Sequence, residues 1–128
     1  MTIFNALIRT HHITSRKKIN KLTQAAKSHN VFVLLRSGGP PGIMYVEGGE
    51  SGVKGWVDVV ASLRYKDHHL AARPSLVVRE VKPTKSLCTE PGLAEIETVK
   101  DFGLQMQRRG VYEWWRVGVG YAGQSDRF

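Results

Sequence analysis

The stretch VFVLLRSGGPPGIMYVEGG, residues 31–49, decides the fold that we predict for this chain. Residues 31–36 are apolar up to Arg36, residues 43–46 are apolar throughout, and the aliphatic and β-branched side chains in both runs are typical of strands. Between them, residues 38–42 are all glycine or proline, which tolerate positive φ or lack a backbone donor. The pattern predicts two strands joined by this loop, and therefore a hairpin.

On each side of the hairpin, apolar spacing predicts one helix and one strand. Before it, residues 3–13 alternate loosely and predict a strand, and a helix follows that Thr14 or Ser15 can cap. After it, residues 53–63 carry apolar side chains at spacings of three and four, which predicts an amphipathic helix. Residues 76–81 then predict a fourth strand. The resulting order is β-α-β-β-α-β.

This order predicts an α+β fold of the ferredoxin-like, split βαβ type, with two helices on one face of an antiparallel sheet. Residues 82–92 have no periodicity and predict a linker, and residues 95–109 predict an additional C-terminal helix. Trp114-Trp115 lies in a short helix or an extended segment that docks on the core. We expect a single domain over residues 1–119 and a flexible tail over residues 120–128.

Positive charge is concentrated in the first half of the chain. The net charge is +8, and residues 1–46 contain seven Lys or Arg residues and no acid, so all eleven acids lie from Glu47 onward. Such a distribution favours an anionic partner, such as nucleic acid, that binds the first half.

The remaining composition predicts an intracellular protein, nuclear or cytoplasmic, with no membrane span. The apolar runs are far shorter than the roughly 18 to 20 residues that cross a bilayer. Cys88 is the only cysteine, which excludes an intramolecular disulfide and a zinc site built on several thiolates.

We predict that the basic residues of the first half, with a second basic group around Tyr65, bind RNA. An unneutralised helix face can contact several phosphates, and aromatic or imidazole rings on an exposed sheet face or strand end can stack on bases. The predicted RNA-binding residues are His11, His12, Arg16, Lys17, Lys18, Lys21, Arg36, Arg64, Tyr65, Lys66 and Arg73.

Several short motifs also resemble a known family. They are Thr10-His11-His12-Ile13 with Ser15, Lys17-Lys18 with Ile19, Gly39-Pro40-Pro41-Gly42-Ile43, Val46-Glu47-Gly48 and Gly110-Val111-Tyr112-Glu113-Trp114-Trp115. In order and spacing they resemble the C-terminal domain shared by the spliceosomal factor Prp-three and RWD-domain-containing proteins, a domain of unknown function. In the splicing factor, this ferredoxin-like domain helps to hold a single-stranded stretch of small nuclear RNA. The resemblance therefore implies binding of single-stranded RNA and a link to RNA processing or splicing.

The sequence gives weaker support for metal binding or catalysis than for RNA binding. Adjacent strand residues such as His11 and His12 point to opposite faces, so we expect no metal site, and no cofactor is indicated. His12-Ile13-Thr14 fits the His-x-Thr element of RNA-end phosphoesterases, but the second element is missing, because Leu70 and Ala71 follow the other histidine pair. We therefore expect no catalysis. A protein-interaction adaptor that uses the Trp114-Trp115 segment remains the alternative.

Overall fold

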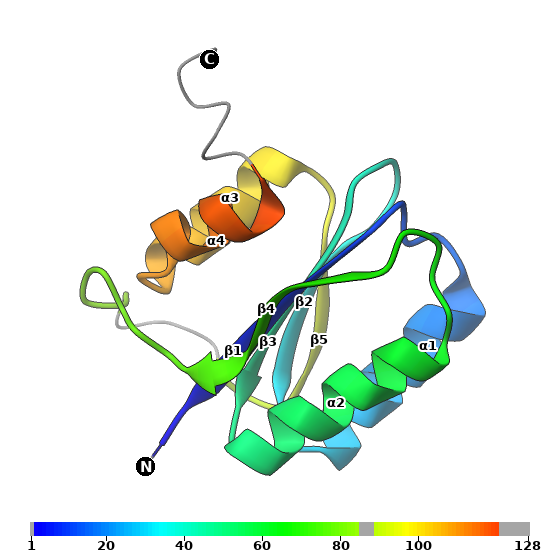
Figure 1. Ribbon diagram of the computed structural model, residues 1–128, viewed down its shortest axis with the longest axis horizontal. Coiled ribbons are helices and arrows are strands. Elements are labelled where there is room, and N and C mark those ends of the chain that lie inside the picture. Colours follow the sequence, from blue (N-terminus) through cyan, green and yellow to red (C-terminus); the bar gives the residue numbers. More distant parts are fainter. Residues whose placement is uncertain (1, 85–88, 121–128) are drawn as a thin grey trace.

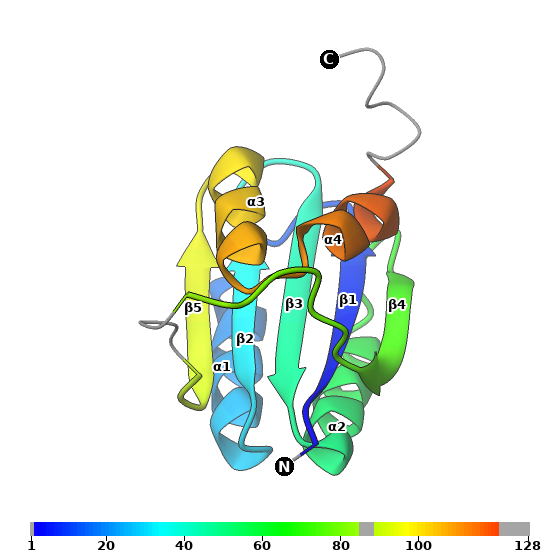
Figure 2. The same cartoon turned by 90° about the vertical axis from the view of Figure 1, so that its left-hand side faces the viewer.

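The computed structural model describes residues 2–84 and 89–120, and it places helices on both faces of a central sheet (Figure 1, Figure 2). In chain order the elements are β1 (Phe4–Thr10), α1 (Arg16–Ser28), β2 (Phe32–Arg36), β3 (Gly42–Gly48), α2 (Glu50–Ser62), β4 (His69–Leu76), β5 (Gly92–Ile96), α3 (Val99–Arg108) and α4 (Tyr112–Val119). The predicted α+β class is confirmed. Within the described residues, no helix is both long and apolar enough to span a bilayer.

The predicted hairpin forms the centre of the sheet. β2 and β3 pair antiparallel, with Phe32 opposite Glu47 and Arg36 opposite Ile43. β3 also pairs antiparallel with β1, and β1 pairs antiparallel with β4. The first six elements therefore follow the predicted β-α-β-β-α-β order.

The sheet is larger than predicted and is mixed. Its strand order is β4-β1-β3-β2-β5, and β5 runs parallel to β2, so the fold is not an exact match to the predicted antiparallel split βαβ arrangement. β5 lies where we predicted a linker and the start of a helix at residue 95, whereas α3 begins at Val99. Its sequence, GLAEI, contains Ala and Glu, which favour helix. Pairing with β2 overrides that preference.

Two strand boundaries also differ from the prediction. The fourth strand at residues 76–81 is wrong, because β4 covers His69–Leu76 and Val78 is 77% exposed. Pro74 is tolerated there because β4 is an edge strand, where a missing N–H costs little. The first strand ends at Thr10, and Ile13 instead forms an isolated bridge with Gly38. Of the predicted tail, residues 121–128 lie outside the described residues.

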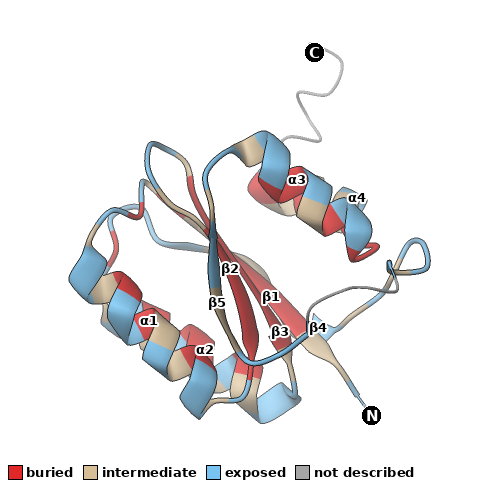
Figure 3. Ribbon diagram, turned by 180° about the vertical axis from the view of Figure 1, so that it is seen from behind, coloured by how far each residue is buried: buried red, intermediate tan, exposed pale blue. Residues whose placement is uncertain are grey.

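Apolar side chains are buried on both faces of the sheet, along the strands that are red in Figure 3. Val33 and Met44 point toward α1 and α2, while Leu34 and Tyr45 belong to a second core beneath α3 and α4. Strands that are covered on both faces read as continuous apolar runs rather than as alternating ones. The expectation that helices cover only one face is therefore wrong.

Local signals in the first helix pair act as the sequence predicts. Ser15 caps α1 by accepting from the Lys18 amide at 3.3 Å, and Asn30 takes the left-handed conformation after the helix, with φ of 57°. Trp56 of α2 is fully buried, and its indole N–H donates to the Leu22 carbonyl at 3.1 Å. This bond joins α2 to α1 across the core.

A buried ionic cluster fastens the second helix pair to the sheet. Glu47 of β3 is 5% exposed, and its carboxylate lies 3.3 Å from both Arg109, which is 1% exposed, and Arg79. The Tyr45 hydroxyl donates to the same carboxylate at 2.6 Å, and the Arg109 guanidinium lies 3.9 Å from the centre of the Phe32 ring. Burial and the neighbouring Glu47 raise the pKa of Tyr45. The cluster therefore joins the end of α3 to β2 and β3.

We predict that Glu47→Ala destabilises the protein by about 3–5 kcal/mol, because it leaves buried arginine charge without its carboxylate. Urea denaturation measures the free energy of unfolding. Glu50→Ala is the matched control, since Glu50 pairs with Lys54 on an exposed helix face and such a pair contributes about 0.3–0.5 kcal/mol. Equal losses in the two variants would contradict a structural role for the buried cluster.

Candidate nucleic-acid interface

Three loops meet at the end of the sheet where β1 and β2 finish (Figure 1). The Gly38 amide donates to the Ile13 carbonyl at 3.1 Å, and the Gly42 amide donates to the His11 carbonyl at 3.1 Å. The His11 amide donates to the Lys66 carbonyl at 2.9 Å. These bonds join the segment after β1, the β2–β3 loop and the α2–β4 loop into one surface.

Cations from α1 and from the α2–β4 loop gather on this surface. Lys18 of α1 lies over the Tyr65 ring, with its ammonium 4.7 Å from the ring centre, which brings the two elements together. Among the described residues, no acid forms an ion pair with any member of the group. We call this group the cationic surface, and its members are Lys17, Lys18, Lys21, Arg64 and Lys66.

Tyr65 is buried beneath the cationic surface and is not exposed to a ligand. It is 8% exposed and belongs to the core under α1 and α2. Burial raises the pKa of its hydroxyl to about 12, so the side chain stays neutral at physiological pH. A base can therefore reach the Lys18 side of the ring only by displacing the lysine.

The two histidines lie beside the cationic surface. The ring centres of His11 and His12 are 4.9 Å apart, with a tilt of 51° between the planes. His11 Nδ1 is 3.7 Å from an Asp67 oxygen, while His12 is exposed. Within residues 2–84 and 89–120, the structure contains no group of three or more His, Cys, Asp or Glu residues suited to hold a metal ion. The rings are placed to stack on a base or to donate to a phosphate.

Arg64, one of the two cations in the α2–β4 loop, has an unusual backbone conformation. Arg64 has φ of 54° and Asp67 has φ of 56°, both in the left-handed region. A side chain other than glycine costs roughly 1–2 kcal/mol there. Tolerated strain of this kind is concentrated at functional sites.

Three predicted site residues do not belong to the cationic surface. Arg16 pairs with Glu95 at 2.7 Å, so the expectation of an unneutralised helix face is wrong at this position. Arg36 donates to the carbonyls of Glu97, Gly39 and Pro41, and so braces the β2–β3 loop. Arg73 is exposed on β4, four residues beyond His69 and about 13 Å along the strand.

Glu95 is the residue that sequence reasoning missed. The register of β5 on β2 places it opposite Leu35, and from there it reaches both Arg16 and the Ser37 hydroxyl, which donates at 2.8 Å. The hydrogen bond from Arg16 lowers the pKa of Glu95, with a further contribution from Ser37. To predict this contact from the sequence, one would first have to predict the strand β5. Its sequence favours helix, so the contact could not be anticipated.

The open face of the sheet that we expected for base stacking is also absent, because α3 and α4 cover it (Figure 2). A ligand of the basic residues must therefore lie across the strand ends. The chain matches no family model, and no curated protein resembles it at a significant level.

We predict that Glu95 stabilises the fold at neutral pH and not in acid. Its pKa in the folded protein lies below the ordinary value of 4.5, so its contribution is present above that value and is lost as pH falls through the folded pKa. The melting temperatures of the native protein and Glu95→Gln, measured across this range, should therefore converge at low pH. A difference that persists in acid would contradict an ionic origin.

Proposed function

We propose that this protein is a non-catalytic RNA-binding module that takes single-stranded RNA across the ends of its strands. The observation that carries the proposal is the cationic surface, in which cations from two separate elements lie together and form no ion pair with the described acids. Acids usually alternate with bases on a solvated helix face, whereas α1 contains none.

Phosphate binding is the chemistry that such a surface favours. Each phosphate that a lysine or arginine neutralises releases condensed counterions, which supplies affinity without sequence preference. Lys17 and Lys21 are four residues apart, and so they project from neighbouring turns of one face of α1. Arg64 and Lys66 extend the same charge onto the adjoining loop.

A single strand fits this surface better than a duplex does. Unstacked bases of single-stranded RNA are bound by rings, and His12 is exposed beside the cations. The covered sheet leaves only a short strand-end surface, which a flexible backbone can follow.

The family resemblance supports the same proposal from a separate direction. Its motifs at residues 10–19 and 39–43 are distant in the chain, and the hydrogen bond from the Gly42 amide to the His11 carbonyl brings them together. We propose that the chain is a relative of the Prp-three and RWD-linked domain, and that it acts inside the cell, in the nucleus or cytoplasm, in RNA processing or splicing.

A protein-interaction adaptor is the second candidate, and one observation favours it. A groove of about 890 Å³ lies between α3 and α4, where Tyr112 and Trp115 form part of its wall and Leu104 is 44% exposed. An amphipathic helix of a partner would fit such an apolar groove. Recovery of a stoichiometric protein partner that survives nuclease treatment, and that Leu104→Asp abolishes, would favour this function.

The test of the RNA proposal is a titration of isotope-labelled protein with a mixed-sequence single-stranded RNA of about ten nucleotides, at two salt concentrations. Amide shifts should cluster on residues 11–21 and 64–66 and should weaken at high salt. Shifts confined to α3 and α4, or none at low salt, would contradict the proposal.

We predict that the triple substitution Lys17→Gln, Lys18→Gln and Lys21→Gln weakens RNA binding across all sequences. The slope of log affinity against log salt should fall by about 2, because each lost contact to a single strand removes about 0.7. A triple variant of Lys27, Lys54 and Lys100 is the control, since it removes the same charge away from the cationic surface. Equal effects of the two triples would mean that net charge alone drives binding.

We predict that Arg64→Gly weakens RNA binding without destabilising the fold. Glycine adopts the left-handed conformation freely, so the free energy of unfolding should stay level or rise by up to about 1 kcal/mol. RNA affinity should fall, because one cation is lost. Urea denaturation and RNA titration of the same sample separate the two effects, and unchanged affinity would remove Arg64 from the interface.

A further inference from the structure

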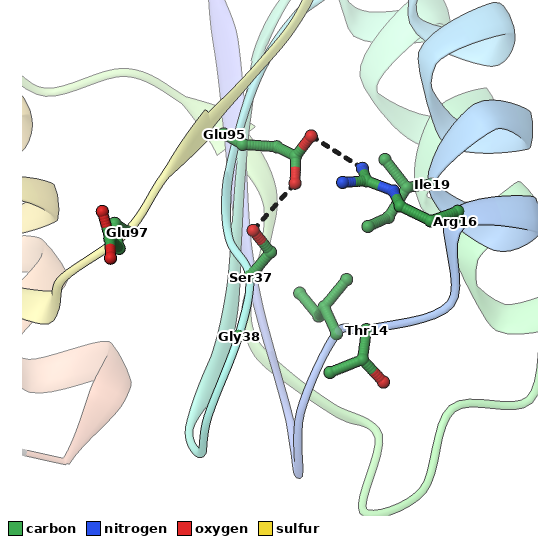
Figure 4. Close-up of a pocket in the computed structure, with 8 residues that line it drawn as sticks. Thr14, Arg16, Ile19, Ser37, Gly38, Glu95 and Glu97 are labelled. Atoms are coloured by element: carbon green, nitrogen blue, oxygen red, sulfur yellow. Dashed lines mark hydrogen bonds and ion pairs between the residues drawn. The ribbon is translucent and has the colours of Figure 1, made fainter.

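A hollow beside the cationic surface contains a carboxylate held by two donors that also suit phosphate (Figure 4). The hollow measures about 390 Å³ and lies between the start of α1 and the ends of β2 and β5. Glu95 Oε2 accepts from Arg16 at 2.7 Å, and its Oε1 accepts from the Ser37 hydroxyl at 2.8 Å. Guanidinium and hydroxyl groups are common donors to the phosphates of nucleic acids.

We propose that Arg16 and Ser37 form a subsite for an RNA phosphate, and that Glu95 occupies this subsite as an internal competitor when RNA is absent. The inference rests on the proposed function, because the subsite adjoins the cationic surface. Arg16 directly precedes Lys17 in the first turn of α1. The subsite and the cationic surface therefore share the first turn of α1.

Glu95 is placed so that an external anion can replace it. The side chains of Arg16 and Glu95 are 65% and 35% exposed, and ion pairs in that setting are weak. A phosphate offers the same acceptor geometry to a guanidinium and, in RNA, comes with neighbouring phosphates for the lysines. Because the Glu95 side chain is already partly exposed, its carboxylate can reach solvent once it is released from Arg16.

Two further polar residues, Thr14 and Glu97, line this hollow. Thr14 is exposed, and in Figure 4 its hydroxyl points away from Arg16 and Ser37. In the same view, the carboxylate of Glu97 points away from Arg16. Glu95 is therefore the acid that competes at this point, and Glu97 provides a matched control.

The experiment compares the native protein, Glu95→Gln and Glu97→Gln in binding a fluorescent mixed-sequence single-stranded RNA over a range of salt. Both variants have the same net charge. Glu95→Gln should bind about two- to fivefold tighter, since RNA otherwise has to displace an exposed ion pair and one hydrogen bond from a hydroxyl. Its salt slope should rise by up to about 0.7, because the native protein engages this phosphate only in the complexes in which Glu95 has been displaced. Glu97→Gln should show less than half of either change.

Adding Arg16→Gln to Glu95→Gln completes the cycle and should remove the whole gain, whereas Arg16→Gln alone should change affinity little. Melting temperatures of each variant show that it is folded. Equal effects of Glu95→Gln and Glu97→Gln, with the native protein still binding RNA, would overturn the internal competitor and leave the proposed function standing. No salt-dependent binding by any variant would overturn both.

Discussion

The burial of β2 and β3 on both faces is the constraint on which the rest of this structure depends. Their side chains alternate between two cores, so each face needs its own cover of helices. α1 and α2 supply one cover, and α3 and α4 supply the other. Because both faces are then occupied, a ligand can reach the sheet itself only at its edges and at the loops at the strand ends.

The second cover is attached through charge as well as through apolar contact. Glu47 follows Tyr45 on the same face of β3, and its buried carboxylate meets Arg109 at the end of α3. Removing a carboxylate from water is costly unless hydrogen bonds and opposite charges replace its hydration. Tyr45, Arg79 and Arg109 supply these partners. The position of the α3–α4 layer is therefore specified by a polar cluster within an otherwise apolar interface.

The same chain topology sets the charge balance at the strand ends. An acid-free α1 would present an uninterrupted basic face, but the parallel pairing of β5 with β2 carries Glu95 to Arg16. The five cations of the cationic surface form no ion pair with any described acid. They are Lys17, Lys18, Lys21, Arg64 and Lys66. One end of the sheet thus combines cations that have no acidic partner among the described residues with one cation, Arg16, that is paired with a carboxylate.

The sequence by itself determined the hairpin at residues 31–49, α1 with its Ser15 cap, the buried Trp56 on α2 and the basic character of the first half. These features depend on neighbours within a few residues, where propensity, periodicity and capping act. Only the tertiary structure decided the conformation of β5, the second core and the Glu95–Arg16 pair. In GLAEI, local preference favours helix and long-range pairing favours strand, and the pairing prevails because β2 offers an unpaired edge whose backbone groups need partners.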